Sequence, residues 1–65
     1  MHESGIAYDV YVTSKRAAEE NHAVTVKTIF VDVGSMAMVN PEQVEFMFRT
    51  FISDDPMFAE TKLVF

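Results

Sequence analysis

The sequence predicts an α+β fold in which two helices pack on a small β-sheet, in the order helix, strand, helix, strand. Two observations predict it. Apolar residues recur at helical spacing in two separate segments, and each of these segments is followed by a shorter run of apolar, strand-forming residues. The chain has 65 residues and shows no linker, repeat or low-complexity segment, so we expect a single domain over residues 1–65.

The first helix is predicted to begin after Ser4, which can act as its cap, and to run to about Asn21. Its apolar face is thin, because the residues at helical spacing are mostly small: Ile6, Ala7, Val10, Ser14, Ala17 and Ala18. Asn21 and His22 end this helix. One of them is expected to have a positive φ, which both residue types tolerate better than most.

Residues 23–33 are predicted to form a long strand with apolar groups on both faces. Ile29, Val31 and Val33 share one face, while Val24, Val26, Thr28 and Phe30 share the other. Phe30 is the residue that we expect at a contact with a second chain. The alternative is that it covers the helix of its own chain.

The second helix has the clearest start in the sequence. Asn40 is a capping residue, Pro41 occupies the first helical position, and Gln43 is placed to return a capping-box hydrogen bond. Asp54-Asp55-Pro56 ends the helix and is read as a turn, and residues 59–65 are predicted to form the second strand. The predicted core stripe of the helix is Val44, Met47, Phe48, Phe51 and Ile52.

A sheet of two strands rarely gives a chain of this length independent stability. The sequence contains no cysteine, so a disulfide framework and a cysteine-type structural zinc site are both excluded. Association with another chain remains as the stabilising device. We therefore expect a second chain to complete the sheet, as a homodimer paired through the edge of strand 23–33 or of residues 61–65.

The net charge of −5 argues against nucleic acid and anionic membranes as partners, since both attract clustered Lys and Arg. No apolar run approaches the roughly 20 residues that span a bilayer, and residues 1–12 lack the pattern of a signal peptide. These features predict a cytoplasmic protein.

The first three residues, Met1, His2 and Glu3, form a candidate metal site. The terminal amine, the amide nitrogen of His2 and its imidazole can close consecutive chelate rings, and Glu3 adds an oxygen donor. Such a nitrogen-rich set suits Ni(II) or Cu(II) better than Mg²⁺ or Ca²⁺. The competing interpretation is an exposed, frayed terminus.

The chain resembles the nickel metallochaperone family HypA/HybF over nearly its whole length. The resemblance rests on short segments in order along the chain: Met1-His2-Glu3, Ile6-Ala7, Val31-Asp32-Val33-Gly34, Val39-Asn40-Pro41-Glu42 with Phe46 and Phe48, and Ala59-Glu60. It implies a protein that delivers Ni(II) to the large subunit of [NiFe] hydrogenase, or to urease, together with the GTPase HypB. It also implies that Met1, His2 and Glu3 hold the nickel and that the chain is a carrier, not an enzyme.

The chain departs from the family pattern in three places. Family members continue into a zinc domain with two CxxC pairs and then return a last strand to the sheet, whereas this sequence has neither feature. Ser4-Gly5 replaces the usual Leu-Ser, and His22 stands where a glycine is usual. The alternative function is therefore that of a shortened or drifted paralogue, a metal-free module for dimerisation or interaction.

His22 is a candidate further metal ligand if a dimer brings two termini together, but a lone histidine after a helix is more often a solvated residue that ends the helix. Three further methionines, Met36, Met38 and Met57, are interpreted as flexible apolar filler and not as metal ligands. No set of nucleophile, base and orienting residue can be assembled from the sequence, which disfavours an enzyme.

Overall fold

The computed structural model describes residues 3–32, 34 and 38–65, and confirms the predicted order of helices and strands. Helix α1 spans Glu3–Glu20, strand β1 spans Thr28–Phe30, helix α2 spans Pro41–Phe51 and strand β2 spans Lys62–Val64. A short 3₁₀ helix, Pro56–Phe58, precedes β2. The α+β class predicted from the sequence is therefore correct.

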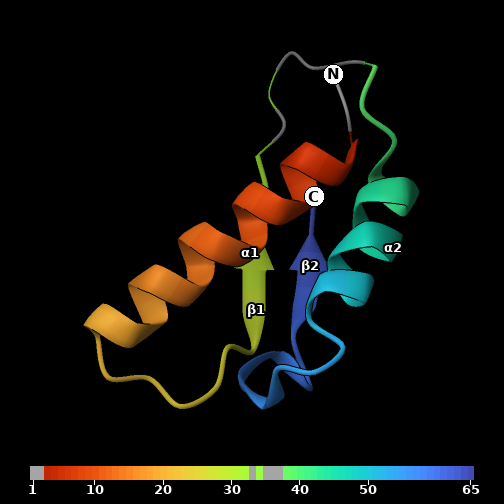
Figure 1. The fold of residues 1–65 in the computed structure, drawn as a ribbon. Helices are drawn as coiled ribbons and strands as arrows, with labels where there is room; N and C mark the ends of the chain where they lie inside the picture. The colour runs from red at the N-terminus through yellow and green to blue at the C-terminus, as the bar shows by residue number, and fades with distance from the viewer. Residues whose placement is uncertain (1–2, 33, 35–37) are drawn as a thin grey trace.

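The two strands are parallel neighbours, with Ile29 of β1 opposite Leu63 of β2. Parallel strands need a crossover connection, and α2 supplies it. Both helices lie on the same face of the sheet, and α1 runs diagonally across it (Figure 1). Thr28 and Phe30 are exposed while Ile29 and Val31 are partly buried, so the second face of the sheet is the uncovered one.

Helix α1 begins earlier than the sequence predicted. Ser4 lies inside the helix, and its predicted role as the cap is wrong, because Glu3 is already helical and places a carboxylate in the first turn, where the helix dipole favours it. The end of the helix follows the prediction. His22 has a φ of 57°, and its N–H donates to the Glu19 carbonyl while the N–H of Ala23 donates to the Ala18 carbonyl. This is a Schellman ending with histidine at the left-handed position.

Helix α2 begins as predicted at Asn40 and Pro41. The Asn40 side chain accepts hydrogen bonds from the backbone N–H of Glu42 (3.0 Å) and of Gln43 (3.3 Å). The expected capping-box return from Gln43 is replaced by a bond from another helix, since the N–H of Asn40 donates to the carboxylate of Glu3 at 3.3 Å.

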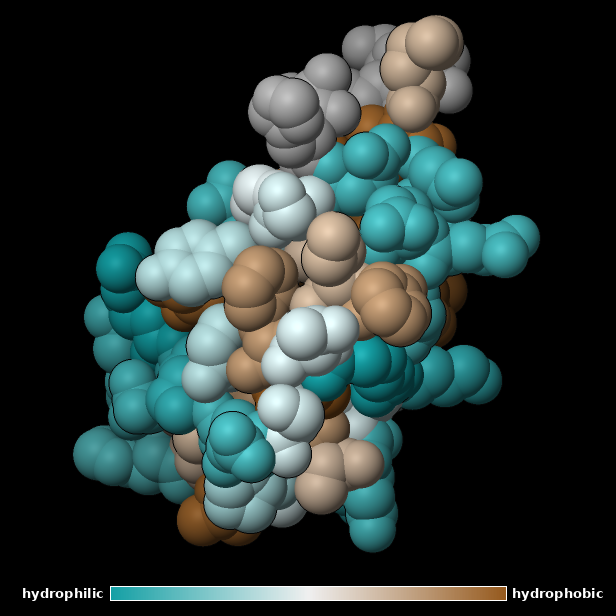
Figure 2. All heavy atoms as spheres, turned by 45° about the vertical axis from the view of Figure 1, so that its right-hand side comes forward, coloured by the Kyte–Doolittle hydropathy of each residue, from teal (hydrophilic) through white to brown (hydrophobic). Residues whose placement is uncertain are grey.

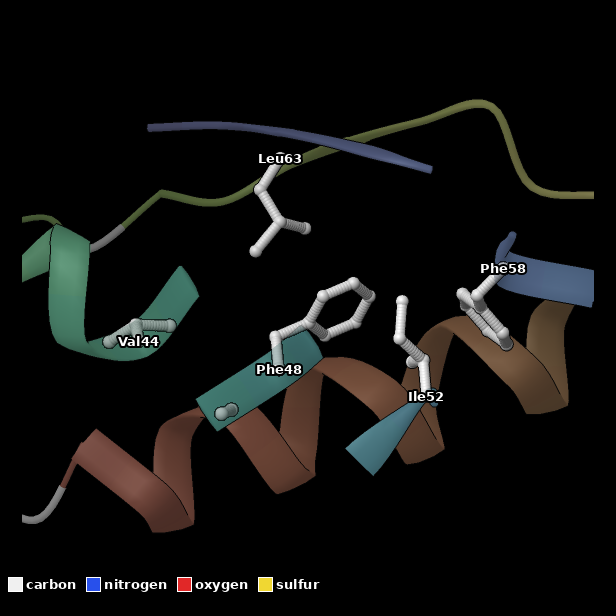
Figure 3. Close-up of a cluster of buried hydrophobic side chains, with 6 residues drawn as sticks. Val44, Phe48, Ile52, Phe58 and Leu63 are labelled. Atoms are coloured by element: carbon white, nitrogen blue, oxygen red, sulfur yellow. The ribbon is translucent and has the colours of Figure 1, made fainter. Parts of the chain in front are cut away.

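The core lies between the helices and the inner face of the sheet. Figure 3 shows Leu63 pointing from the sheet toward Phe48 of α2, with Val44, Ile52 and Phe58 completing the cluster. Ala7 of α1 is fully buried against this cluster, so the small residues of α1 allow the two helices to approach closely. The rings of Phe48 and Phe58 meet edge to face with their centroids 6.0 Å apart.

Two predicted core positions of α2 differ from the prediction. Met47 is only partly buried, although it packs against the core, and Phe51 is 38% exposed. Phe51 packs edge to face on Tyr8 of α1, with centroids 5.6 Å apart. The apolar residues of α2 therefore serve two contacts: some lie in the core, and Phe51 packs against α1 at the surface. Of the other methionines, Met57 is partly buried, Met38 is exposed, and Met36 lies outside the described residues.

The strands are much shorter than predicted. Of the expected strand 23–33, only Thr28–Phe30 pairs in the ladder, and of residues 59–65 only Lys62–Val64 pairs. Val33 lies outside the described residues. Phe30 is 79% exposed, so it does not cover a helix of its own chain. That alternative is wrong.

One polar cluster ties α1 to the segment that follows α2. Asp55 accepts hydrogen bonds from the Tyr11 hydroxyl (2.8 Å) and from Lys15 Nζ (2.5 Å), and its other oxygen accepts from the backbone N–H of Met57 (3.1 Å). The predicted turn at Asp54-Asp55 is confirmed, with Asp55 as the cap of the 3₁₀ helix.

The outer surface is mixed. Figure 2, which turns the α2 side forward, shows apolar atoms emerging in the middle of a largely hydrophilic face. Three aromatic residues of the two helices are substantially exposed: Tyr8, Phe46 and Phe51. Among the described residues, no helix has the length and apolar character needed to cross a membrane.

Candidate metal centre at the N-terminus

The predicted metal site falls at the boundary of the described chain. Met1 and His2 lie outside the described residues, whereas Glu3 is the first residue of α1 and is partly buried. The structure therefore places one of the three predicted site residues and leaves the other two as predictions.

Glu3 is fixed at the start of both helices. Its carboxylate Oε2 accepts the backbone N–H of Asn40 at 3.3 Å, and Asn40 caps α2 through its own side chain. The N–H of an N-cap residue and the positive end of the α2 dipole both favour a carboxylate at this point. The first residue of α1 is thus held against the first turn of α2.

This arrangement leaves Glu3 able to act as an oxygen donor. A carboxylate has about four lone-pair sites, and the described contacts of Glu3 use one of them, at the long end of the hydrogen-bond range. Glu3, which follows the predicted chelating residues Met1 and His2, is therefore anchored to the fold. Its second carboxylate oxygen can still coordinate a cation.

The other predicted ligand does not approach this point. His22 is exposed at the far end of α1, and a helix of 18 residues separates it from Glu3 by about 27 Å. Its position after the helix confirms the reading as a solvated helix-ending residue. Across residues 3–32, 34 and 38–65, no three His, Cys, Asp or Glu side chains come together in a way that could hold a metal.

Asn40 is the neighbour of the site that sequence reasoning missed. The sequence predicts Asn40 as a helix cap, but its contact with Glu3 joins residues 37 positions apart and has no local signature. The same is true of the hydrogen bonds that Tyr11 and Lys15 donate to Asp55, which join residues 44 and 40 positions apart.

Comparison with known proteins gives one consistent family. The whole chain, residues 1–65, matches the family described as "Hydrogenase/urease nickel incorporation, metallochaperone, hypA". No solved structure matches the chain.

Several curated relatives carry the same name. The chain is 38% identical over 55 residues to "Hydrogenase maturation factor HypA" of Methanocella arvoryzae, an alignment that covers 85% of this chain and 49% of that protein. It is 45% identical over 47 residues to the protein of the same name from Methanothermobacter thermautotrophicus, covering 72% of this chain and 38% of the relative. With the Methanosarcina barkeri protein it shares 30% identity over 64 residues, covering 98% of this chain and 47% of the relative.

The chain spans about half the length, or less, of these relatives. The match nevertheless includes Met1, His2 and Glu3, together with both helices and both strands. By the family match over all 65 residues, and by these relatives, the chain belongs to the HypA family of hydrogenase and urease nickel-incorporation metallochaperones.

Proposed function

We propose that the chain is a nickel carrier for [NiFe] hydrogenase maturation and that it holds Ni(II), its cargo, at Met1, His2 and Glu3. The observation that carries the proposal is the family match over residues 1–65, because the family is described by nickel incorporation and the match begins at the chelating tripeptide. The anchored position of Glu3 supports it, since a partly buried carboxylate lies at the base of the tripeptide.

The proposed donors are the terminal amine of Met1, the backbone amide and imidazole of His2, and either the amide or the carboxylate of Glu3. Consecutive chelate rings through backbone nitrogen favour a square-planar ion, which suits Ni(II). Coordination by an amide displaces its proton, so the affinity for nickel should fall as the pH is lowered.

The remaining parts of the proposal follow the family. The chain acts as one nickel-binding domain, in the cytoplasm, and it carries metal without catalysing a reaction. HypB and the hydrogenase large subunit are its proposed partners, and a second copy of the chain is the proposed partner of the sheet edge. Residues 1–65 contain no cysteine, so these residues offer no thiolate ligand for a structural zinc.

A metal-free interaction module is the second candidate. It is favoured by the exposed Phe30 on a short, open sheet, which is a feature of chains that bind by strand addition. The two candidates differ in one property, since only the carrier needs an unblocked terminus.

The proposal is tested by titrating Ni(II) into protein with a native N-terminus, compared with the His2→Ala variant. We expect about one equivalent of Ni(II) to bind to the native chain and at least tenfold weaker binding to His2→Ala, since loss of the imidazole removes one donor and opens the chelate ring that it closes. His22→Ala is the matched control and should bind as the native chain does. Equal binding by the native chain and His2→Ala would reject the site.

A further inference from the structure

The first turn of α1 extends beyond the part of the helix that the core supports. The first residues of α1 that pack against the core are Ile6, which is partly buried, and Ala7, which is fully buried. Ser4 and Gly5, which precede them in the helix, are both exposed. Figure 1 shows this turn at the end of α1 that lies beside the start of α2. Burial therefore stabilises α1 from Ile6 onward and contributes little to residues 4 and 5.

Gly5 weakens this turn, and nothing around it requires a glycine. A Cβ at Gly5 would meet no heavy atom within 4 Å, and its φ is not positive. Gly34 differs, because its φ of 56° is one that other residues rarely adopt. Within a helix, glycine is less favourable than alanine, since it loses more backbone freedom when it is ordered. Gly5 therefore shifts the local equilibrium toward the uncoiled form by about threefold relative to alanine.

One described hydrogen bond joins the side chains of this turn to another element. The carboxylate of Glu3 accepts the backbone N–H of Asn40 at 3.3 Å, near the long end of the hydrogen-bond range, and the bond is exposed. The helical backbone of the turn sets the position of Glu3, so uncoiling moves the carboxylate away from Asn40. The turn and this bond should open together, as one local unit, while the rest of α1 stays on the core.

We propose that the first turn of α1, residues 3–5, is a release device for the nickel cargo and that Gly5 sets how readily it opens. The inference rests on the proposed function, in which donors from His2 and Glu3 hold the ion. When the turn is closed, Glu3 is fixed against the start of α2. When it is open, the donors can leave the ion one at a time as those of an acceptor replace them. An alanine at position 5 would keep the turn closed for longer.

Opening is measured first, in metal-free protein, by amide hydrogen exchange. In an α-helix the N–H groups of residues 7, 8 and 9 bond to the carbonyls of residues 3, 4 and 5, so their exchange reports the opening of this turn. Gly5→Ala should slow that exchange about threefold, and Ser4→Gly should speed it about twofold. The double variant should lie within about twofold of the native chain.

Thr13→Ala is the matched control for these variants. Thr13 is exposed on α1 outside the first turn, and alanine raises the helix propensity there by an amount similar to that of Gly5→Ala. It should leave exchange at residues 7–9 unchanged. The control separates the opening of the turn from the stability of the whole helix.

Nickel release is measured second. Protein with a native N-terminus is loaded with Ni(II) and mixed with excess EDTA, and the loss of the bound ion is followed in a stopped-flow instrument. Release should be about threefold slower in Gly5→Ala, about twofold faster in Ser4→Gly and unchanged in Thr13→Ala. The association rate should change by less than about 1.5-fold, because the turn is already helical and alanine adds little to the closed population.

The two measurements separate failure of the device from failure of the proposed function. A native chain that binds no nickel would overturn both. A native chain that binds nickel, and whose Gly5→Ala variant shows slower exchange but unchanged release, would overturn the device alone. Equal exchange at residues 7–9 in the native chain and Gly5→Ala would also overturn it, whatever the nickel data show.

Discussion

Asp55 is the residue whose chemistry the fold alters most clearly. The hydrogen bonds from Lys15 and then from Tyr11 lower the pKa of its carboxyl, because both donors stabilise the ionised form. The same contact with Asp55 raises the pKa of Lys15 and of the Tyr11 hydroxyl. The three groups form one unit in which the carboxylate is the common acceptor.

This unit predicts how stability depends on pH. A group whose pKa is lower in the folded than in the unfolded chain adds stability above its unfolded value and loses that stability as the pH falls. For Asp55 the loss should appear as the pH falls below about 4. Lys15 and Tyr11, whose pKa values are raised, contribute below about pH 10 and lose their contribution as the pH rises beyond it.

The measurement is the free energy of unfolding in urea as a function of pH, for the native chain and for Asp55→Asn. We expect the two curves to differ most near neutral pH and to converge at both extremes. Asp54→Asn is the control, because Asp54 is exposed and its neighbour makes the contacts. A constant difference between native and Asp55→Asn at every pH would contradict the assignment.

At the scale of single residues, sequence reasoning found what depends on near neighbours. Asn40, Pro41 and His22 act as predicted because a cap or a left-handed residue is specified within a few positions. The contact between Glu3 and Asn40 could not be predicted, since it requires knowing that the two helices start side by side.

The start of α2 is the element on which the account of the site depends most. Asn40 both caps α2 and binds Glu3 of α1, whereas the Gln43 side chain makes no described bond to Asn40. Asn40→Ala should lower the free energy of unfolding by about 1 kcal/mol through loss of the cap. Gln43→Ala should change it by less than about 0.5 kcal/mol.

Chemical unfolding of the two variants distinguishes this arrangement from a capping box. In a capping box, the Gln43 side chain would accept a hydrogen bond from the Asn40 N–H, and Gln43→Ala would lower the free energy of unfolding as well. Comparable destabilisation by Gln43→Ala and Asn40→Ala would therefore show that Glu3 does not supply the acceptor.

The two faces of α2 make unequal contributions to stability. Phe48 is fully buried between Phe58 and Leu63, while Phe46, two positions earlier, is 64% exposed. Phe48→Ala should cost about 3–5 kcal/mol, which is comparable with the total stability of a domain of this size. The cooperative thermal transition should then be lost, whereas Phe46→Ala should shift it little.

Circular dichroism on heating is the measurement for this pair of variants. A retained transition in Phe48→Ala together with its loss in Phe46→Ala would reverse the assignment of the buried face.

For the whole molecule, the number and order of elements were predictable, and the extent of the sheet was not. Periodicity locates α1, α2 and the two strand regions, but a strand extends only as far as its partner does. Since β2 is held to Lys62–Val64 by the 3₁₀ helix before it, most of the predicted strand 23–33 has no ladder to join. Phe30 is exposed for the same reason, because the described sheet has only two short strands and no described element covers its side chain.

The candidate site divides in the same way. Its residue types can be recognised in the sequence, because the proposed ligands Met1, His2 and Glu3 are adjacent, and the family can be recognised there too. The support beneath it, in which α1 is fixed to the cap of α2, is a property of the packed chain.

The most direct test of the account is equilibrium dialysis of the unmodified, metal-free polypeptide against Ni(II), beside the same chain acetylated at its N-terminus. Acetylation removes the amine donor and leaves every side chain in place. We predict about one equivalent of nickel in the unmodified chain and none in the acetylated one, with identical sedimentation of the two. An unmodified chain that leaves dialysis without nickel, or an acetylated chain that retains it, would contradict the carrier function.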